Sequence, residues 1–107
     1  MRNRGFRVNQ NDINTNGSRL QGHLDITFQE LSIILGKPIL SNSDKTKAEW
    51  RIEGEVNGRL VIATIYDWKT NKNPEYVTDW NIGGYNDLSV SLIRKMFPDT
   101  RVSRSRF

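Results

Sequence analysis

The chain has 107 residues, a formal net charge of +4 and no cysteine. This length fits one domain with a modest core, and the absence of cysteine excludes disulfides, thiolate chemistry and cysteine-based metal sites. No apolar run approaches the roughly 18 residues that a membrane-spanning helix needs. No apolar stretch follows the basic residues near the N-terminus, so we expect no secretory signal, no membrane contact and an intracellular location.

The positive charge is concentrated at the two ends of the chain. The first 19 and the last seven residues each carry a net charge of +3, whereas the residues between them carry −2. The N-terminal part is also rich in Asn and poor in apolar residues, which is typical of a mobile segment. The sequence therefore predicts a mobile basic arm over residues 1–18, a single domain over residues 19–99 and a basic tail over residues 100–107.

A first helix is indicated directly after Thr27. Thr27 and Glu30 have the spacing of a capping box, in which each side chain bonds to the backbone of the other residue. Gly36 suits the position that follows a helix end, and Pro38 prevents the helix from continuing. We therefore expect a short helix that ends before Gly36.

A β-hairpin is expected next, around the Asn-Gly pair at residues 57–58. Asn-Gly between two β-rich runs is the strongest short hairpin signal. A two-residue turn pairs Trp50 with Ile65 on an apolar face that should meet the core. The opposite face, which carries Ile62 and Tyr66, is half apolar and could line a groove or a subunit contact.

A third strand over residues 76–82 and a second helix complete the domain. The Gly-Gly pair at residues 83–84 ends the strand, Asn86 can cap the helix, and Pro98 stops it. With a further short strand near residues 19–23, the elements indicate an α+β fold that has a three- to four-stranded antiparallel sheet and two helices.

Residues that could carry out chemistry are few. His23 is the only histidine, and without cysteine a zinc site would need carboxylates from elsewhere. Asp67 and Asp79 flank an aromatic segment, but nothing in the sequence orders them as an acid–base pair, and no catalytic motif is present. We therefore predict that the protein is not an enzyme and has no catalytic residue, metal or cofactor.

The segment from Tyr66 to Gly84 has two interpretations. Trp68 beside Lys69 offers a flat surface next to a cation, which suits a nucleobase with its phosphate. Gly83 and Gly84 before a helix can point consecutive N–H groups at an anion. The plainer alternatives are core or interface packing for the aromatic residues and an ordinary strand-to-helix turn for the glycines.

Five short motifs are spread over roughly residues 18–97. They are LQG at 20–22, GKP at 36–38, EW at 49–50, ATIYDWK at 63–69 and WNIGG at 80–84. Together they resemble a widespread family of small proteins of phages and large DNA viruses. Members of that family often have His at the position of Asn81, so an acid–base role is not carried over to this chain. The chain also resembles the Thoeris anti-defence proteins, which sequester signals of the cyclic ADP-ribose type.

The resemblance implies a viral counter-defence protein of the host cytoplasm that sequesters a nucleotide-derived immune signalling molecule. Aromatic residues would stack the base, cations and glycine amides would hold phosphates, and a carboxylate or amide would contact ribose hydroxyls. The candidate ligand-binding residues are Arg51, Tyr66, Asp67, Trp68, Lys69, Trp80, Asn81, Gly83 and Gly84.

The partners expected are this small ligand and a second copy of the chain. A domain of this size has little room for a deep pocket, so a pocket shared within a homo-oligomer is favoured. Two alternatives use other partners. The protein could inhibit a host defence enzyme or nuclease by covering it with the same aromatic residues, or it could be an accessory nucleic-acid-binding protein that acts through its basic ends.

Overall fold

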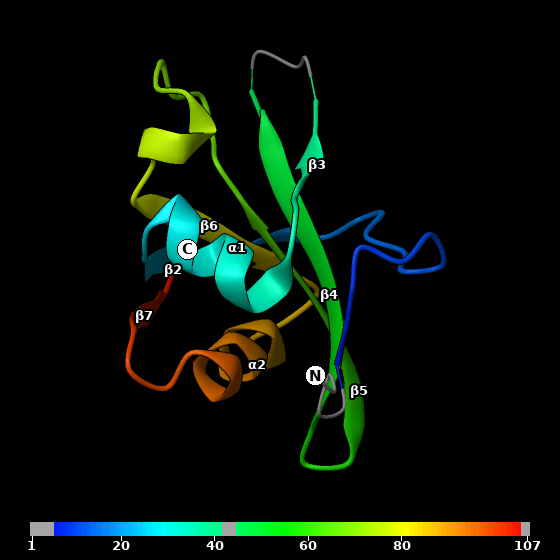
Figure 1. Ribbon diagram of the computed structural model, residues 1–107. Helices are drawn as coiled ribbons and strands as arrows, with labels where there is room; N and C mark the ends of the chain where they lie inside the picture. Colours follow the sequence, from blue (N-terminus) through cyan, green and yellow to red (C-terminus); the bar gives the residue numbers. More distant parts are fainter. Residues whose placement is uncertain (1–5, 42–44, 106–107) are drawn as a thin grey trace.

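The chain folds into a seven-stranded antiparallel sheet with two helices, seen in a computed structural model that describes residues 6–41 and 45–105 (Figure 1). The strand order is β1-β4-β5-β6-β2-β7, and β3 also pairs with β4. The strands are β1 (Arg7–Val8), β2 (Arg19–Asp25), β3 (Ile39–Leu40), β4 (Ala48–Val56), β5 (Arg59–Tyr66), β6 (Asp79–Gly84) and β7 (Arg101–Arg104). The helices are α1 (Phe28–Leu35), α2 (Leu88–Met96) and the short 3₁₀ turn η1 (Pro74–Tyr76). The α+β class is thus confirmed, but the sheet is larger than predicted.

Helix α1 begins with the predicted capping box. The hydroxyl of Thr27 accepts the backbone N–H of Glu30 at 3.1 Å, and the Glu30 carboxylate accepts the N–H of Thr27 at 3.5 Å. The helix ends at Leu35 and is followed by Gly36, whose φ of 83° lies in the left-handed region that favours glycine. Within the described ranges, no helix is long and apolar enough to cross a membrane.

The hairpin of β4 and β5 has the predicted register, with Trp50 opposite Ile65. Asn57 and Gly58 form its turn with φ values of 53° and 81°, which is the backbone conformation that a two-residue hairpin turn requires. With 9 and 8 residues, these are the longest strands of the described chain, and they form the long green ribbon pair of Figure 1.

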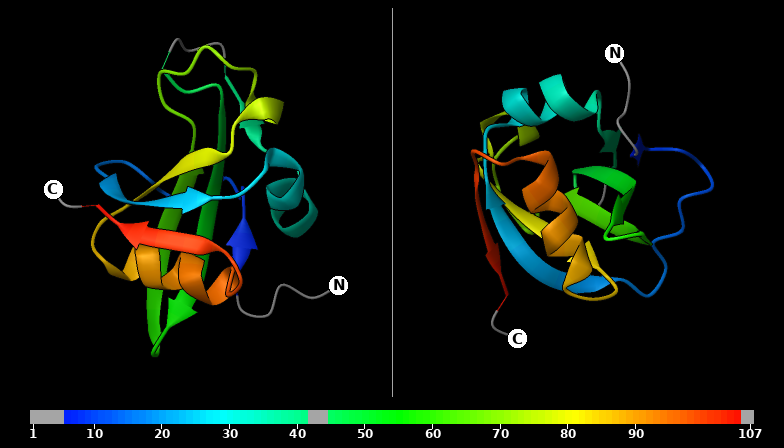
Figure 2. Two further views of the ribbon diagram at one scale, coloured as in Figure 1. Left: turned by 90° about the vertical axis from the view of Figure 1, so that its left-hand side faces the viewer. Right: turned by 90° about the horizontal axis from the view of Figure 1, so that it is seen from below.

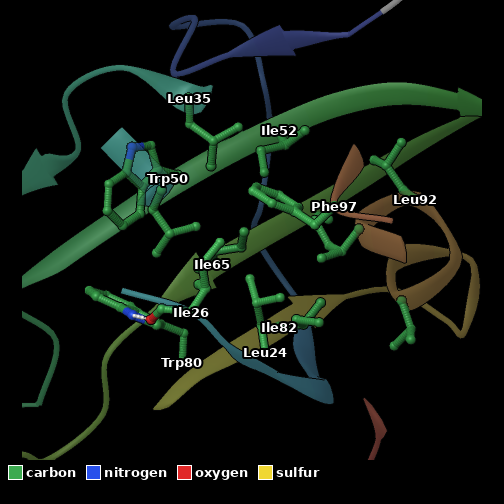
Figure 3. Packing of buried hydrophobic residues seen from close by; sticks show 14 of the residues in the cluster. Leu24, Ile26, Leu35, Trp50, Ile52, Ile65, Trp80, Ile82, Leu92 and Phe97 are labelled. Atoms are coloured by element: carbon green, nitrogen blue, oxygen red, sulfur yellow. Dashed lines mark hydrogen bonds between the residues drawn. The ribbon is translucent and has the colours of Figure 1, made fainter. Parts of the chain in front are cut away.

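The core lies between one face of the sheet and the two helices (Figures 2 and 3). At its centre the rings of Trp50 and Trp80 meet edge to face, with centroids 5.4 Å apart. Each buried indole donates its N–H to a backbone carbonyl, Trp50 to Gly36 at 2.9 Å and Trp80 to Ile26 at 3.1 Å. These bonds satisfy the polar atom of each ring and tie the ends of α1 to the sheet.

Two of the additional strands come from the segments predicted to be an arm and a tail. β1 pairs with β4, and β7 pairs with β2. Ile13, in the connection between β1 and β2, is 2% exposed. The folded domain therefore extends beyond the predicted boundaries at residues 18 and 100. Strands of two to four residues are too short for an alternating pattern to be recognised in the sequence.

The outer edge of β4 is covered by two short segments of the chain. β1 pairs with the middle of the strand, and β3 pairs with its first two residues. Between them, the N–H of Asn9 donates to the carbonyl of Arg51 at 2.7 Å, and the side-chain oxygen of Asn9 accepts the N–H of Arg51 at 2.7 Å. Asn9 has a φ of 56°, a conformation that Asn adopts more readily than most residues.

The third strand of the prediction is shifted along the chain. Its predicted first residue, Tyr76, instead belongs to the turn η1, in which the N–H of Val77 donates to the carbonyl of Pro74 at 3.0 Å. Strand β6 begins only at Asp79 and includes both Gly83 and Gly84. Helix α2 also begins one residue later than predicted, because Asn86 bonds to the N–H of Leu88 at 2.9 Å from outside the helix and Asp87 is the capping residue.

Candidate functional site

The sheet has a second face that points away from the core. Successive side chains of a strand point to opposite faces, so the neighbours of the buried core residues in β4, β5, β6 and β2 lie on this side. We call it the outer face. Its central residues are Glu49, Arg51, Thr64, Tyr66, Asn81, Gly83 and His23.

Two hollows include residues of the outer face, and Trp68 lines both. The first, the Asp67 hollow, has a volume of about 350 Å³ and is lined by Asp67, Trp68, Thr70, Lys72, Val77, Thr78, Asp79 and Asn81. The second, the Tyr66 hollow, has a volume of about 320 Å³ and is lined by Ser18, Arg19, Thr46, Glu49, Thr64, Tyr66, Trp68 and Gly83. A ligand that contacts Trp68 can therefore extend into either hollow.

Trp68 is exposed because the chain leaves the sheet at this point. It is the second residue after β5, and the next residue, Lys69, has a φ of 49° and donates its N–H to the carbonyl of Lys45 at 2.7 Å. The Trp68 side chain is 48% exposed. Tyr66 packs edge to face against its ring at a centroid distance of 6.2 Å, and Lys69 Nζ lies 5.5 Å from the ring centroid. Lys69 therefore already makes a cation–π contact with the indole.

Tyr66 combines an apolar ring with a phenol in a half-buried position. Burial raises the pKa of Tyr66 above its usual value of 10.0, and the negative charge of Glu49 raises it further. The phenol is therefore neutral over the physiological pH range. In this form the phenolic O–H can donate a hydrogen bond in the Tyr66 hollow.

Asp67 is buried, with an exposed fraction of only 1%. Its Oδ1 accepts the backbone N–H of Lys47 at 2.9 Å and that of Ala48 at 3.1 Å. These bonds hold the start of β4 against the end of β5. The other carboxylate oxygen, Oδ2, has no hydrogen-bond partner within the described residues.

Asn81 borders the Asp67 hollow and bonds to the only histidine of the chain. Its Oδ1 lies 3.1 Å from Nδ1 of His23. Because a carbonyl oxygen can only accept, Nδ1 carries the proton and Nε2 of a neutral ring carries the lone pair. The amide N–H₂ of Asn81 then remains as a donor at the edge of the hollow.

Two arginines belong to the Tyr66 hollow or its immediate surroundings. Arg19 is part of its lining. Arg51 lies opposite Thr64 in the hairpin and donates to the Glu49 carboxylate at 3.2 Å. The pair with Glu49 offsets part of the charge of Arg51, so the predicted phosphate role of Arg51 depends on this pair opening.

The two glycines do not form the predicted anion site. Both lie within β6 and pair with β5 on one side and β2 on the other, so their backbone groups belong to the sheet and not to a helix start. A Cβ at Gly83 would lie 2.5 Å from Thr64 Oγ1, and a Cβ at Gly84 would overlap Ser89 of α2. Glycine is required here because neighbouring groups approach closely.

Trp80 does not lie on the ligand side either. It is fully buried in the core, and Figure 3 shows it among Leu24, Ile26 and Ile65. Stacking on a ligand is incompatible with this position. The alternation of side chains along a strand puts Trp80 and Ile82 on one face, but the sequence does not show which face of the sheet this is.

The structure thus brings together seven of the nine predicted residues and adds others. They lie in or beside the two hollows and are Arg51, Tyr66, Asp67, Trp68, Lys69, Asn81 and Gly83. Sequence reasoning missed the lining residues Ser18, Arg19, Thr46, Glu49, Thr64, Thr70, Lys72, Val77 and Thr78. Most of these are ordinary polar residues with no distinctive local pattern, and Arg19 comes close only through the long-range pairing of β2 with β6.

No protein-family model, no curated protein and no solved structure matches this chain. Among the residues that the structure describes, no group of three or more His, Asp or Glu side chains is placed to hold a metal ion. The geometry of the two hollows is therefore the observation on which a function can be argued.

Proposed function

We propose that the protein binds a small nucleotide-derived ligand around Trp68 and acts by holding it rather than by converting it. The observation that carries this proposal is the exposure of Trp68 at the shared rim of two polar hollows. An indole is large and apolar, and burying it against a flat ring is favourable. Tyr66 packs against the indole of Trp68 and holds its ring in place. Stacking a base on the indole therefore costs less conformational entropy.

The two hollows offer different chemistry to the two ends of such a ligand. The Tyr66 hollow has Arg19 in its lining and Arg51 next to it, so it is suited to a phosphate. The Asp67 hollow contains two carboxylates, hydroxyls and an amide, and it is suited to the donor groups of a sugar. Each volume lies near the lower end of the range of roughly 300–1,000 Å³ that is typical of small-molecule sites.

In the viral setting that the sequence motifs imply, this protein would sequester an immune signalling molecule of the host cytoplasm. Sequestration requires tight binding and no reaction. His23, the one histidine that could act as a base, lines neither hollow and directs the proton of Nδ1 to Asn81. We therefore propose binding alone as the activity.

A second copy of the chain is part of the proposal. Neither hollow alone encloses a ligand that has both a base and several phosphates, and a partner subunit placed over the outer face would close them. Light scattering should then give a mass of at least twice 12.4 kDa. A monomer at micromolar concentration that still binds the ligand tightly would rule out the shared pocket.

The proposal is tested by comparing two variants in which one exposed apolar residue is replaced by alanine. Trp68→Ala should weaken binding of a nucleotide-derived ligand by about 5- to 150-fold, the equivalent of about 1–3 kcal/mol for one stacked base. Ile33→Ala is the matched control, because Ile33 is 74% exposed, lies on α1 on the opposite side of the sheet and belongs to neither hollow. Calorimetry with a library of cyclic and linear nucleotides gives the affinities.

Intrinsic fluorescence provides an independent measurement. Trp50 and Trp80 are fully buried, whereas Trp68 is half exposed, so quenching by a bound base should be lost in Trp68→Ala. Equal affinities of the two variants and of the unchanged protein would reject the site. Failure of every nucleotide to bind would favour the alternative, in which the same surface covers a host defence protein.

A further inference from the structure

The carboxylate of Asp67 has one oxygen in use and one that is not. Oδ1 accepts two backbone N–H groups, whereas the buried Oδ2 has no partner in the described chain. A buried polar atom without a partner is destabilising, and natural proteins rarely keep one without a reason. Asp67 also lines the Asp67 hollow. A ligand that occupies this hollow can therefore donate a hydrogen bond to the unpaired Oδ2.

The other groups around this hollow define the kind of donor. Thr70 and Thr78 contribute hydroxyls, Asn81 an amide, Asp79 a second carboxylate and Lys72 a cation. An ammonium group only donates and offers no acceptor to Lys72 or to the Asn81 amide, whereas a phosphate only accepts and would be repelled by the two carboxylates. A neutral hydroxyl both donates and accepts, so it matches a mixed lining of this kind best.

We infer that the Asp67 hollow is a subsite for the vicinal diol of a furanose sugar, with Asp67 Oδ2 as the acceptor of one of its hydroxyls. The inference rests on the proposed function only in assigning this sugar to the same ligand as the base on Trp68. Trp68 borders the hollow, so a sugar placed here lies next to the ring on which the base would stack.

Access to Oδ2 requires a small movement of the lining, because Asp67 is only 1% exposed. The part best able to move is the loop after Trp68, which lies outside the strands and helices. Its anchors include Lys47 Nζ, which donates to the carbonyls of Thr70 at 2.9 Å and Lys72 at 3.2 Å. A sugar hydroxyl that enters the hollow would displace this loop slightly and take up the unpaired acceptor.

The test uses the full chain and a sugar that carries no base. Amide resonances of ¹⁵N-labelled protein are followed during titration with methyl β-D-ribofuranoside and, separately, with its 2,3-dideoxy analogue. The diol should shift the amides of Asp67, Thr78 and Asn81 with saturation in the millimolar range, as expected for a fragment of this size. The dideoxy analogue should shift none of them.

A substitution at Asp67 then identifies the acceptor. In Asp67→Asn the retained oxygen can still accept the N–H groups of Lys47 and Ala48, while the Oδ2 position becomes a donor. This change should weaken diol binding about fivefold, the loss of one hydrogen bond, while the protein stays folded with only a small loss of melting temperature. Asp25→Asn is the control, because Asp25 lies opposite Asp79 in the sheet but outside the hollow.

The outcomes separate this inference from the proposed function. Equal shifts with both sugars, no shifts with either, or a diol preference that survives in Asp67→Asn would overturn it. So would a crystal soaked with the diol that shows only a water molecule on Oδ2. If Asp67→Asn does not fold, the comparison of the two sugars on the unchanged protein decides. Because these sugars lack a base, they test the Asp67 hollow alone. The diol can therefore bind there even if Trp68 does not stack nucleotides.

Discussion

The backbone of Gly84 in β6 lies directly against the side chain of Ser89 in α2, so closely that a Cβ on the glycine would overlap the serine oxygen. Ser89 is held in this position because its hydroxyl donates to the carbonyl of Ile62 at 2.7 Å. Gly84 thus allows α2 to pack closely against β6, and Ser89 connects the same helix to β5. The role of Gly84 is structural, and this changes what a mutation there should do.

Gly84→Ala should destabilise the protein by about 1–3 kcal/mol, the usual cost of overpacking, and should leave ligand affinity unchanged in the molecules that remain folded. Urea unfolding gives the loss. In a Ser89→Gly background, which removes the overlapping atoms, the same substitution should cost clearly less. An equal cost in both backgrounds would mean that the contact with Ser89 is not its origin.

Asp67 allows two substitutions with different expected effects on stability. Asp67→Ala leaves the N–H groups of Lys47 and Ala48 without their acceptor, which should cost about 2–4 kcal/mol. Asp67→Asn keeps an acceptor oxygen and should cost less than about 1 kcal/mol. Thermal unfolding of the two variants tests the difference. Similar losses would show that charge, and not the two backbone bonds, stabilises this position.

Ile13 is the residue that best tests whether the N-terminal segment is part of the fold. It is 2% exposed although it does not belong to the main core cluster. Ile13→Ala should therefore destabilise the protein by about 2–5 kcal/mol, as a buried aliphatic residue does. Leu60→Ala, at a 73% exposed position, should change stability by less than about 0.5 kcal/mol. If the two variants have the same denaturation midpoint, Ile13 does not contribute to the fold, and the prediction of a mobile arm would stand.

Tyr66 should make stability fall at alkaline pH. Its pKa is raised in the folded protein, so the unfolded chain loses this proton at a lower pH than the folded chain does. The contribution of Tyr66 is fully present below the usual value of 10.0 and is lost as pH rises through the folded pKa. Denaturation between about pH 9 and 11 should show a shallower fall for Tyr66→Phe. Parallel curves would mean that the phenol does not titrate differently in the two states.

Local sequence signals predicted the elements that depend on local interactions. The capping box of Thr27 and Glu30 lies within one helical turn, and the Asn57-Gly58 turn sets the register of the β4–β5 hairpin from within. Both were confirmed because neither depends on distant parts of the chain. The same holds for the end of α1 at Gly36, where a left-handed residue is needed.

Long-range pairing explains most of what was missed. The pairing of β2 with β6 and β7 joins segments that lie far apart in the sequence, and it determines that Gly83 and Gly84 are strand residues and that Trp80 faces the core. In the candidate site, Trp68 and Asp67 were recognised by residue type alone. Arg19 and Thr78 were not, because only the completed sheet and its loops bring them to the hollows.

The covered edge of β4 has a consequence for the protein in a crowded cell. An exposed strand of 9 residues presents a row of free N–H and C=O groups that can template aggregation with other chains. Here β1, Asn9 and β3 occupy much of that row. The proposed function requires binding protein in proportion to the ligand that is held, so under this proposal the protein must accumulate together with its ligand. The short segments along β4 thus favour solubility at the abundance that such a role demands.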